Sequence, residues 1–315
     1  MPRPSLPLIP AGPLRGAVTF TLIFLNSAAC CVPLFILALI KLALPIKTVR
    51  ASLRRALTGV AETWIDINTQ VVSRTQSIRW QVSGLDGLDT QSWYLVIANH
   101  RSWVDILALQ AVCNRRIPFL KFFLKERLRW VPVMGLAWWA LDMPFMKRYS
   151  RAELERRPEL RGKDLETTRR ACERFREIPT SVINFVEGTR FTPTKRSAGS
   201  SPYRNLLPPR AGGVAFVIAA MGSTLGDLLD VTIAYPGGGG GLWALCCGRI
   251  RDIVIEVERR PLDAWLVAGD YAADAAVRGR FQAWLAVLWS VKDARLDQLL
   301  AAPIAASAPA PPSRA

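Results

Sequence analysis

The chain has 315 residues, half of them hydrophobic, and 41 basic residues outnumber 25 acidic ones to give a net charge of +16. This length allows one large domain or two with an ample core, and the hydrophobic share is high for a soluble enzyme but low for a polytopic membrane protein. The charge predicts an anionic partner: a phosphate-bearing substrate, an anionic lipid surface or nucleic acid. The six cysteines show no metal-type C-x-x-C spacing. We interpret them as reduced packing residues facing a cytoplasm, and we predict no metal site.

The first element of the chain is an apolar run from residue 16 to residue 40 that contains no Lys, Arg, Asp or Glu. As one helix it would be about 37 Å long, enough to cross roughly 30 Å of hydrocarbon. Pro33 also allows a kinked hairpin within one leaflet, and a cleaved signal peptide is the third alternative. Five cations follow the run by residue 55, against two before it. The positive-inside rule therefore predicts an inner-membrane protein with the bulk of its chain facing the cytoplasm.

The next segments alternate between helix and strand patterns. Residues 50–74 have apolar side chains at spacings of three and four, which predicts a helix, and residues 77–82 alternate as a strand. Residues 121–130 interleave cations with aromatic side chains, which suits a membrane–water interface, a stacking surface for single-stranded nucleic acid or an ordinary packed element. Residues 130–141 are nearly all apolar but too few to cross a bilayer, so we expect a buried or interfacial element.

The only histidine of the chain lies between a predicted strand and a predicted helix. Residues 94–98 form an apolar run too short for a helix, and residues 106–112 continue as an apolar helix. His100 therefore lies at the carboxyl end of a strand, where open α/β sheets bind their ligands. Asp105, five residues later, has two interpretations. It caps the helix with Ser102 as in a capping box, or its carboxylate holds one imidazole nitrogen and leaves the other free as a base.

A second buried strand, residues 181–186, ends in Glu187-Gly188-Thr189-Arg190. The glycine allows the backbone to turn or to approach a ligand closely, and the arginine offers a planar fork that suits phosphate. A surface salt bridge beside a turn glycine is the alternative. The remaining expected elements are a flexible loop over 192–205, a helix over 211–220, strands over 229–235 and 253–257, a loose glycine connection over 237–241 and an amphipathic helix over 283–291.

These elements predict an α/β fold, a mixed β-sheet flanked by helices with an N-terminal membrane-embedded helix or helical hairpin. The expected boundaries are a membrane anchor over residues 1–48, one folded domain over residues 49–300 and a disordered Ala/Pro-rich tail over residues 301–315.

Four patterns in this order resemble the blocks of the glycerolipid acyltransferase family, which includes the 1-acylglycerol-3-phosphate acyltransferases. The resemblance covers roughly residues 75–260, and Asp142 departs from it where glycine is commonest. The patterns are Asn99-His100-x4-Asp105 (an HX4D motif), Phe145-x-x-Arg148, Val186-Glu187-Gly188-Thr189-Arg190 and Val231 to Pro236.

The resemblance implies transfer of an acyl group from acyl-CoA or acyl carrier protein to the free hydroxyl of a lysophospholipid, with no cofactor beyond the acyl donor. It implies that His100 is the general base and that Asp105 holds the imidazole. It also implies that Arg190 and Arg148 grip the acceptor phosphate, that Gly188 and Thr189 shape the pocket, and that Glu187 orients Arg190 or the glycerol.

Two other classes of function remain open on the sequence. A non-catalytic, membrane-tethered binder of anionic lipids would need the cations but not His100. A nucleic-acid-binding protein fits the net charge, but no helix-turn-helix, finger or RNA-recognition pattern supports it, so the expected partners are membrane lipids and lipid substrates, with no nucleic acid.

Overall fold

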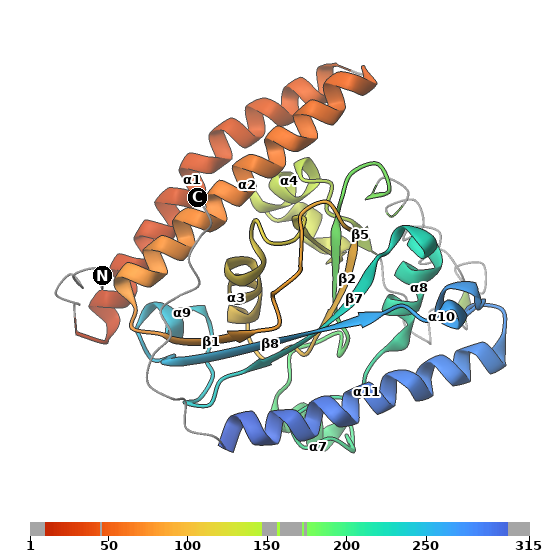
Figure 1. Cartoon of the computed structure of the whole chain (residues 1–315). Helices are drawn as coiled ribbons and strands as arrows, with labels where there is room; N and C mark the ends of the chain where they lie inside the picture. The colour runs from red at the N-terminus through yellow and green to blue at the C-terminus, as the bar shows by residue number, and fades with distance from the viewer. Residues whose placement is uncertain (1–9, 45, 147–155, 158–171, 173–174, 302–315) are drawn as a thin grey trace.

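The computed structural model describes residues 10–44, 46–146, 156–157, 172 and 175–301. A twisted sheet lies at the centre, with helices on both faces, and two long helices run side by side along one flank (Figure 1). The expected α/β architecture, a mixed sheet flanked by helices with an N-terminal apolar helix, is confirmed. Residues 302–315 of the expected tail lie outside the described residues, whereas residue 301 still belongs to a helix, and the domain boundaries stay a prediction.

The central sheet has six strands in the order β1-β8-β7-β2-β6-β3. All neighbours are parallel except β7 and β8. A short parallel pair, β4 with β5, forms a second sheet. The strands are β1 (Arg79–Ser83), β2 (Tyr94–Ala98), β3 (Leu120–Phe122), β4 (Leu124–Lys125), β5 (Phe145–Met146), β6 (Ser181–Phe185), β7 (Asp227–Ala234) and β8 (Asp252–Pro261).

Strand β2 lies between β6 and β7, and all five of its side chains are buried. A continuous apolar run is what a parallel strand covered on both faces requires. Ala98, its last residue, pairs with Phe185 at the end of β6 and with Val231 in β7. Because these three strands are parallel, the segments that follow them emerge at one edge of the sheet.

The two faces of β2 pack against different helices. Tyr94, Val96 and Ala98 belong to the core beneath α3 (Val104–Cys113), whereas Leu95 and Ile97 pack towards α8 (Ala211–Met221) and α11 (Ala275–Ala301). Helix α11 is much longer than the expected 283–291, and the expected loop at 192–205 contains helix α7 (Pro193–Ala198). The shorter helices and turns are η1 (Glu126–Trp130), α4 (Met134–Ala140), η3 (Gly222–Thr224), α9 (Leu242–Cys246) and α10 (Ala264–Ala268).

The N-terminal region is a hairpin of two long helices, α1 (Pro13–Ala43) and α2 (Lys47–Thr75), which lie antiparallel (Figure 1). Helix α1 continues through Pro33, so the kinked pair of arms within residues 16–40 is not what forms. Asn26 donates to Asn68 Oδ1 at 2.9 Å, and Trp64 Nε1 donates to the hydroxyl of Ser27 at 2.9 Å. Polar side chains thus hold the two helices together across an otherwise apolar contact.

Candidate active site

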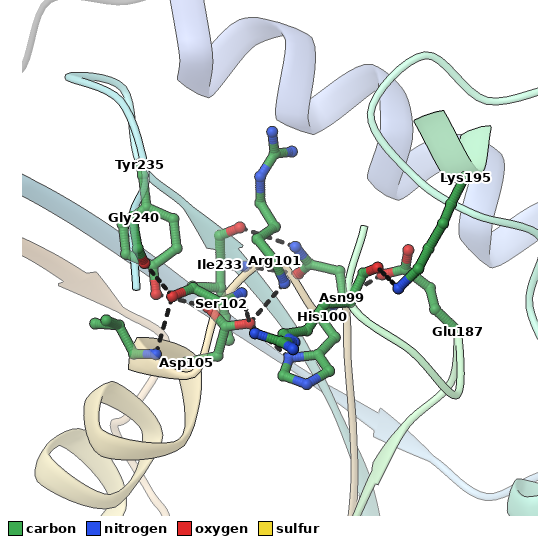
Figure 2. Close-up of polar contacts among 12 residues, drawn as sticks. Asn99, His100, Arg101, Ser102, Asp105, Glu187, Lys195, Ile233, Tyr235 and Gly240 are labelled. Carbon is green, nitrogen blue, oxygen red and sulfur yellow. Dashed lines mark hydrogen bonds and ion pairs between the residues drawn. The ribbon is translucent and has the colours of Figure 1, made fainter. Parts of the chain in front are cut away.

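The turn after β2 is fastened to β7 by the side chain of Asn99. Its amide donates to Ile233 O at 2.9 Å, and its carbonyl oxygen accepts from Ile233 N at 2.8 Å. These two side-chain bonds join the chain to β7 at the first residue after the end of β2. His100 therefore leaves the sheet from a fixed position at its carboxyl edge (Figure 2).

The buried carboxylate of Asp105 faces the imidazole of His100, with Asp105 Oδ2 2.8 Å from His100 Nδ1. The same oxygen accepts from the backbone N–H groups of Arg101 at 2.6 Å and Ser102 at 2.8 Å. The hydroxyl of Ser102 in turn accepts from Val104 N at 3.0 Å. The two interpretations of Asp105 are therefore compatible, because one oxygen caps the turn and also holds the imidazole.

The second carboxylate oxygen of Asp105 accepts a hydrogen bond from the hydroxyl of Tyr235 at 2.6 Å. Tyr235 directly follows β7 and is buried. Burial and the adjacent carboxylate raise the pKa of Tyr235 well above its usual value, so the phenol stays a donor. This residue lies within the fourth sequence block, but no local pattern could have shown that it reaches Asp105, 130 residues away.

The imidazole of His100 stacks on Phe185 from the end of β6, with ring centroids 4.1 Å apart and an interplanar angle of 16°. Its side chain keeps limited access to solvent. With Nδ1 hydrogen-bonded to a carboxylate, Nε2 is the nitrogen left to take a proton. This geometry suits a general base whose tautomer and ring orientation are both set by the protein.

Glu187 is buried beneath the His100 turn. Its Oε1 accepts from His100 N at 2.8 Å, and its Oε2 accepts from Leu207 N at 2.8 Å. Burial raises the pKa of this carboxyl to about 7, although the two N–H groups oppose the shift. The carboxylate therefore holds the backbone of the turn, whereas the resemblance led us to expect that it orients Arg190 or the acceptor. A substrate-binding role for Glu187 stays a prediction.

The residues after Glu187 form a cationic rim beside the turn. Gly188 has φ 68°, a conformation that favours glycine. The guanidinium of the exposed Arg190 lies 5.2 Å from the ring centroid of Trp103. Lys195 of α7, which the sequence assigned to a flexible loop, donates to Thr189 Oγ1 at 2.7 Å and to Arg190 O at 3.0 Å. Arg148 lies outside the described residues, so the expected pairing of Arg148 with Arg190 stays a prediction.

The glycine-rich connection after Tyr235 is also attached to the site. Ser102 donates from its hydroxyl to Gly240 O, which ties residues 237–241 to the His100 turn (Figure 2). The expectation of a loose connection missed this contact. In the part of the chain that the structure describes, no three His, Cys, Asp or Glu side chains gather in a way that could hold a metal ion.

Comparisons with known proteins agree with the family that the sequence blocks resemble. A family model described as "Acyltransferase" matches residues 79–236, half of the chain. The mouse 1-acyl-sn-glycerol-3-phosphate acyltransferase gamma is 27% identical over 213 residues, 64% of this chain and 51% of its own length. The Arabidopsis thaliana 1-acyl-sn-glycerol-3-phosphate acyltransferase 2 is 29% identical over 157 residues, 45% of this chain and 37% of its own.

This chain thus spans about half, or less, of the curated relatives that it matches. The fold resembles the crystal structure of the LPA acyltransferase PlsC from Thermotoga maritima, with a TM-score of 0.56, 14% identity and coverage of 93% of this chain and 99% of that one. The match of the family model over half of the chain shows that this chain belongs to the glycerolipid acyltransferase family, to which the named relatives are also assigned by name.

Proposed function

We propose that the protein transfers a fatty acyl group from an acyl thioester, acyl-CoA or acyl carrier protein, to the free hydroxyl of a lysophospholipid, with 1-acylglycerol-3-phosphate as the acceptor. The observation that carries this proposal is the His100–Asp105 pair at the carboxyl edge of the sheet. The names of the matched relatives support the choice of acceptor.

In this proposal His100 Nε2 takes the proton of the acceptor hydroxyl as its oxygen attacks the thioester carbonyl. A tetrahedral intermediate forms and then collapses with cleavage of the carbon–sulfur bond. The leaving thiolate receives the proton from His100, so the enzyme returns to its starting state. Asp105 stabilises the transient imidazolium and keeps Nδ1 protonated. A positioned general base contributes roughly 10²–10⁴-fold in rate.

The cationic rim is placed to receive the acceptor phosphate. Arg190 presents an exposed guanidinium beside Trp103, which directly follows the His100 turn in sequence. Lys195 adds a second cation within hydrogen-bonding distance of Thr189. Because an arginine fork matches the oxygens of a phosphate, Arg190 is the principal phosphate ligand in this proposal, with Arg148 as a second ligand and Gly188 and Thr189 shaping the pocket.

The membrane attachment that we propose is an embedded hairpin rather than a spanning helix. Among the described helices, α1 alone is long and apolar enough to cross a membrane. However, Gly12 N donates to Cys247 O at 3.0 Å near one end, and Lys41 pairs with Asp142 at 2.8 Å near the other. The paired helix α2 carries seven charged residues. A bilayer-spanning α1 would take these charges into hydrocarbon, at a cost of several kcal/mol.

If α1 instead lies in the plane of one leaflet, it can keep these contacts without taking charged residues into the hydrocarbon. It exposes large apolar side chains along its length, among them Phe20, Leu25 and Leu39. We place the domain on the cytoplasmic face of the inner membrane, where the cations that follow α1 meet anionic lipid headgroups.

The deciding experiment incubates the purified full chain with labelled acyl-CoA and a panel of lysophospholipids. We expect acyl transfer to lysophosphatidate, and His100→Ala should lower it by at least about 10²-fold because the chain has no second imidazole. Circular dichroism would check that the variant is folded. Undiminished transfer by a folded His100→Ala protein would refute the mechanism, and lipid binding without transfer by the wild type would favour the non-catalytic alternative.

A further inference from the structure

An apolar surface outside the active site lies on η1 and α4. Trp130 is 80% exposed, Val133 is 54% exposed and Leu136 is 50% exposed, and Trp139 is also exposed. The opposite side of α4 is buried, because Ala137 and Ala140 pack in a core cluster with α1 and α2. The outward side chains therefore project from a segment that is fixed from behind.

The backbone of this segment is built to hold that arrangement. Val133 has φ 64°, a left-handed conformation that a β-branched residue rarely adopts. A Cβ at Gly135 would lie 2.0 Å from Arg129 O, so the chain folds back closely between η1 and α4. Such strain persists only where surrounding contacts impose it, and it clusters at functional positions.

The charges around the surface favour an anionic lipid bilayer over a protein partner. η1 contains Arg127 and Arg129 against the single acid Glu126. The guanidinium of Arg129 lies 5.2 Å from the ring centroid of Phe145. Tryptophans flanked by arginines are typical of the membrane interface, where the indole sits at the headgroup level and the cation meets lipid phosphate.

Helix α4 also packs against α1, and the core beneath α4 leads towards the candidate active site. Leu34 and Ala38 of α1 share a buried cluster with α4, and Phe122 packs against that cluster. The ring of Phe122 lies 6.3 Å from Phe185, on which His100 stacks. A chain of aromatic contacts thus connects the region beneath this surface to the catalytic imidazole.

We propose that η1 and α4 form a second membrane-insertion surface, which docks into an anionic bilayer beside α1 and sets the orientation of the His100 site to the lipid. A single helix would leave the domain free to rock about its axis, whereas two contacts define a plane. This inference rests on the proposed membrane enzyme, but its test reads membrane contact directly.

The test labels the full chain with an environment-sensitive fluorophore at Trp130→Cys, after Cys30 and Cys31 are replaced by alanine because they are only half-buried. The matched control is Val287→Cys, since Val287 is likewise an exposed apolar residue but lies on α11, on the other side of the sheet (Figure 1). Vesicles of phosphatidylcholine and phosphatidylglycerol are added, with and without spin-labelled lipid.

We expect a blue shift and quenching by the spin-labelled lipid at position 130 and neither at position 287. An unshifted emission at position 130 on protein-loaded vesicles would overturn the proposal. So would a shift that depends on protein concentration without vesicles, because it would assign the surface to a second copy of the chain. These readouts hold whether or not the protein transfers acyl groups.

A functional arm uses the double variant Trp130→Gln/Leu136→Gln. The ratio of activity on vesicle-embedded acceptor to activity on detergent-dispersed acceptor should fall by about fivefold or more, because two apolar anchors are lost. Val287→Gln should leave this ratio unchanged. An unchanged ratio in the double variant would contradict the proposed orientation of the site.

Discussion

Asp105 is the residue on which the geometry of the site converges. One oxygen accepts from His100 Nδ1 and two backbone N–H groups, and the other accepts from Tyr235. A carboxylate removed from water needs such partners, since an unpaired buried charge costs several kcal/mol. The arrangement leaves Asp105 one orientation, and that orientation fixes the imidazole.

The hydroxyl of Tyr235 is the part of this network that one substitution can remove without changing the shape of the core. Tyr235→Phe should lower kcat by about 5–30-fold with little change in KM, because a lost hydrogen bond to a charged group is worth about 1–2 kcal/mol. The measurement is steady-state kinetics over a range of pH. Tyr94→Phe is the control, because Tyr94 is a buried tyrosine of β2 whose hydroxyl accepts from Asp89 N and makes no contact with Asp105 among the hydrogen bonds of the site. Equal effects of the two substitutions would make the role of Tyr235 purely structural.

Glu187 should make stability depend on pH. Burial raises its pKa from 4.5 in the unfolded chain to about 7, so the folded state holds this proton to a higher pH. The stability linked to the neutral carboxyl is complete below about pH 4.5 and is lost as pH rises through about 7, by up to about 3 kcal/mol. Glu187→Gln has no such proton to lose. The free energies of unfolding of the wild type and of Glu187→Gln are measured with urea in detergent. The difference between them should change between about pH 5 and pH 8. A difference that stays constant over this range would contradict the prediction.

At the scale of elements, the site is the common edge of three parallel strands. His100 follows β2, Glu187 follows β6 and Tyr235 follows β7. Each segment alone is an ordinary strand-to-loop transition, and the proposed chemistry depends on the register that brings their ends together. The helices on both faces make the strands buried and therefore rigid.

Helix α1 is part of this packing, and a matched pair of glycine substitutions tests it. A Cβ at Gly16 of α1 would lie 2.6 Å from Cys247 Sγ, whereas a Cβ at Gly59 of α2 would meet nothing within 4 Å. Gly16→Ala should destabilise by about 1–3 kcal/mol through overpacking against α9, and Gly59→Ala should stabilise by about 0.5–1 kcal/mol through helix propensity. Thermal unfolding in detergent measures both. Equal shifts of the same sign would show that α1 is not docked on α9.

At the scale of the whole molecule, ion pairs and a shared buried cluster join the two-helix hairpin to the rest of the fold. Lys41 of α1 and Arg54 of α2 both reach Asp142, at 2.8 Å and 3.5 Å. This is the position where the family resemblance led us to expect glycine. Removal of α1 would uncover Leu57 and Ala61 of α2, which are buried with it. We therefore expect a truncated chain to aggregate rather than to remain as a soluble enzyme.

The full chain should remain on membranes through a wash at about 1 M salt, where surface charge attraction is screened within roughly 3 Å. The apolar face of α1 provides this resistance, because each buried CH₂ contributes about 0.8 kcal/mol. An alkaline wash that releases peripheral proteins is the companion measurement. Release of the full chain by salt alone would show that cations, not α1, hold it on the bilayer.

Local sequence patterns determined a large part of this protein. The apolar run of β2, the single histidine after it and the repeated strand-to-loop pattern at Glu187 located the site, because strand periodicity and turn chemistry act between neighbours. The same patterns showed the family through its ordered blocks. They also found α2 and α8 within a few residues of their ends.

Which distant groups meet depends on the order and register of the strands and could not be inferred from local patterns. Tyr235 reaches Asp105 across 130 residues, and Glu187 bonds to His100 N across 87, because β7 and β6 flank β2 in the sheet. An apolar side chain of α1 can face either lipid or protein, and the sequence does not distinguish the two. The length of the apolar run was therefore compatible with a spanning helix. Its contacts with α2, α9 and Asp142 favour an embedded hairpin instead, since periodicity reports which side chains are apolar but not which surface covers them.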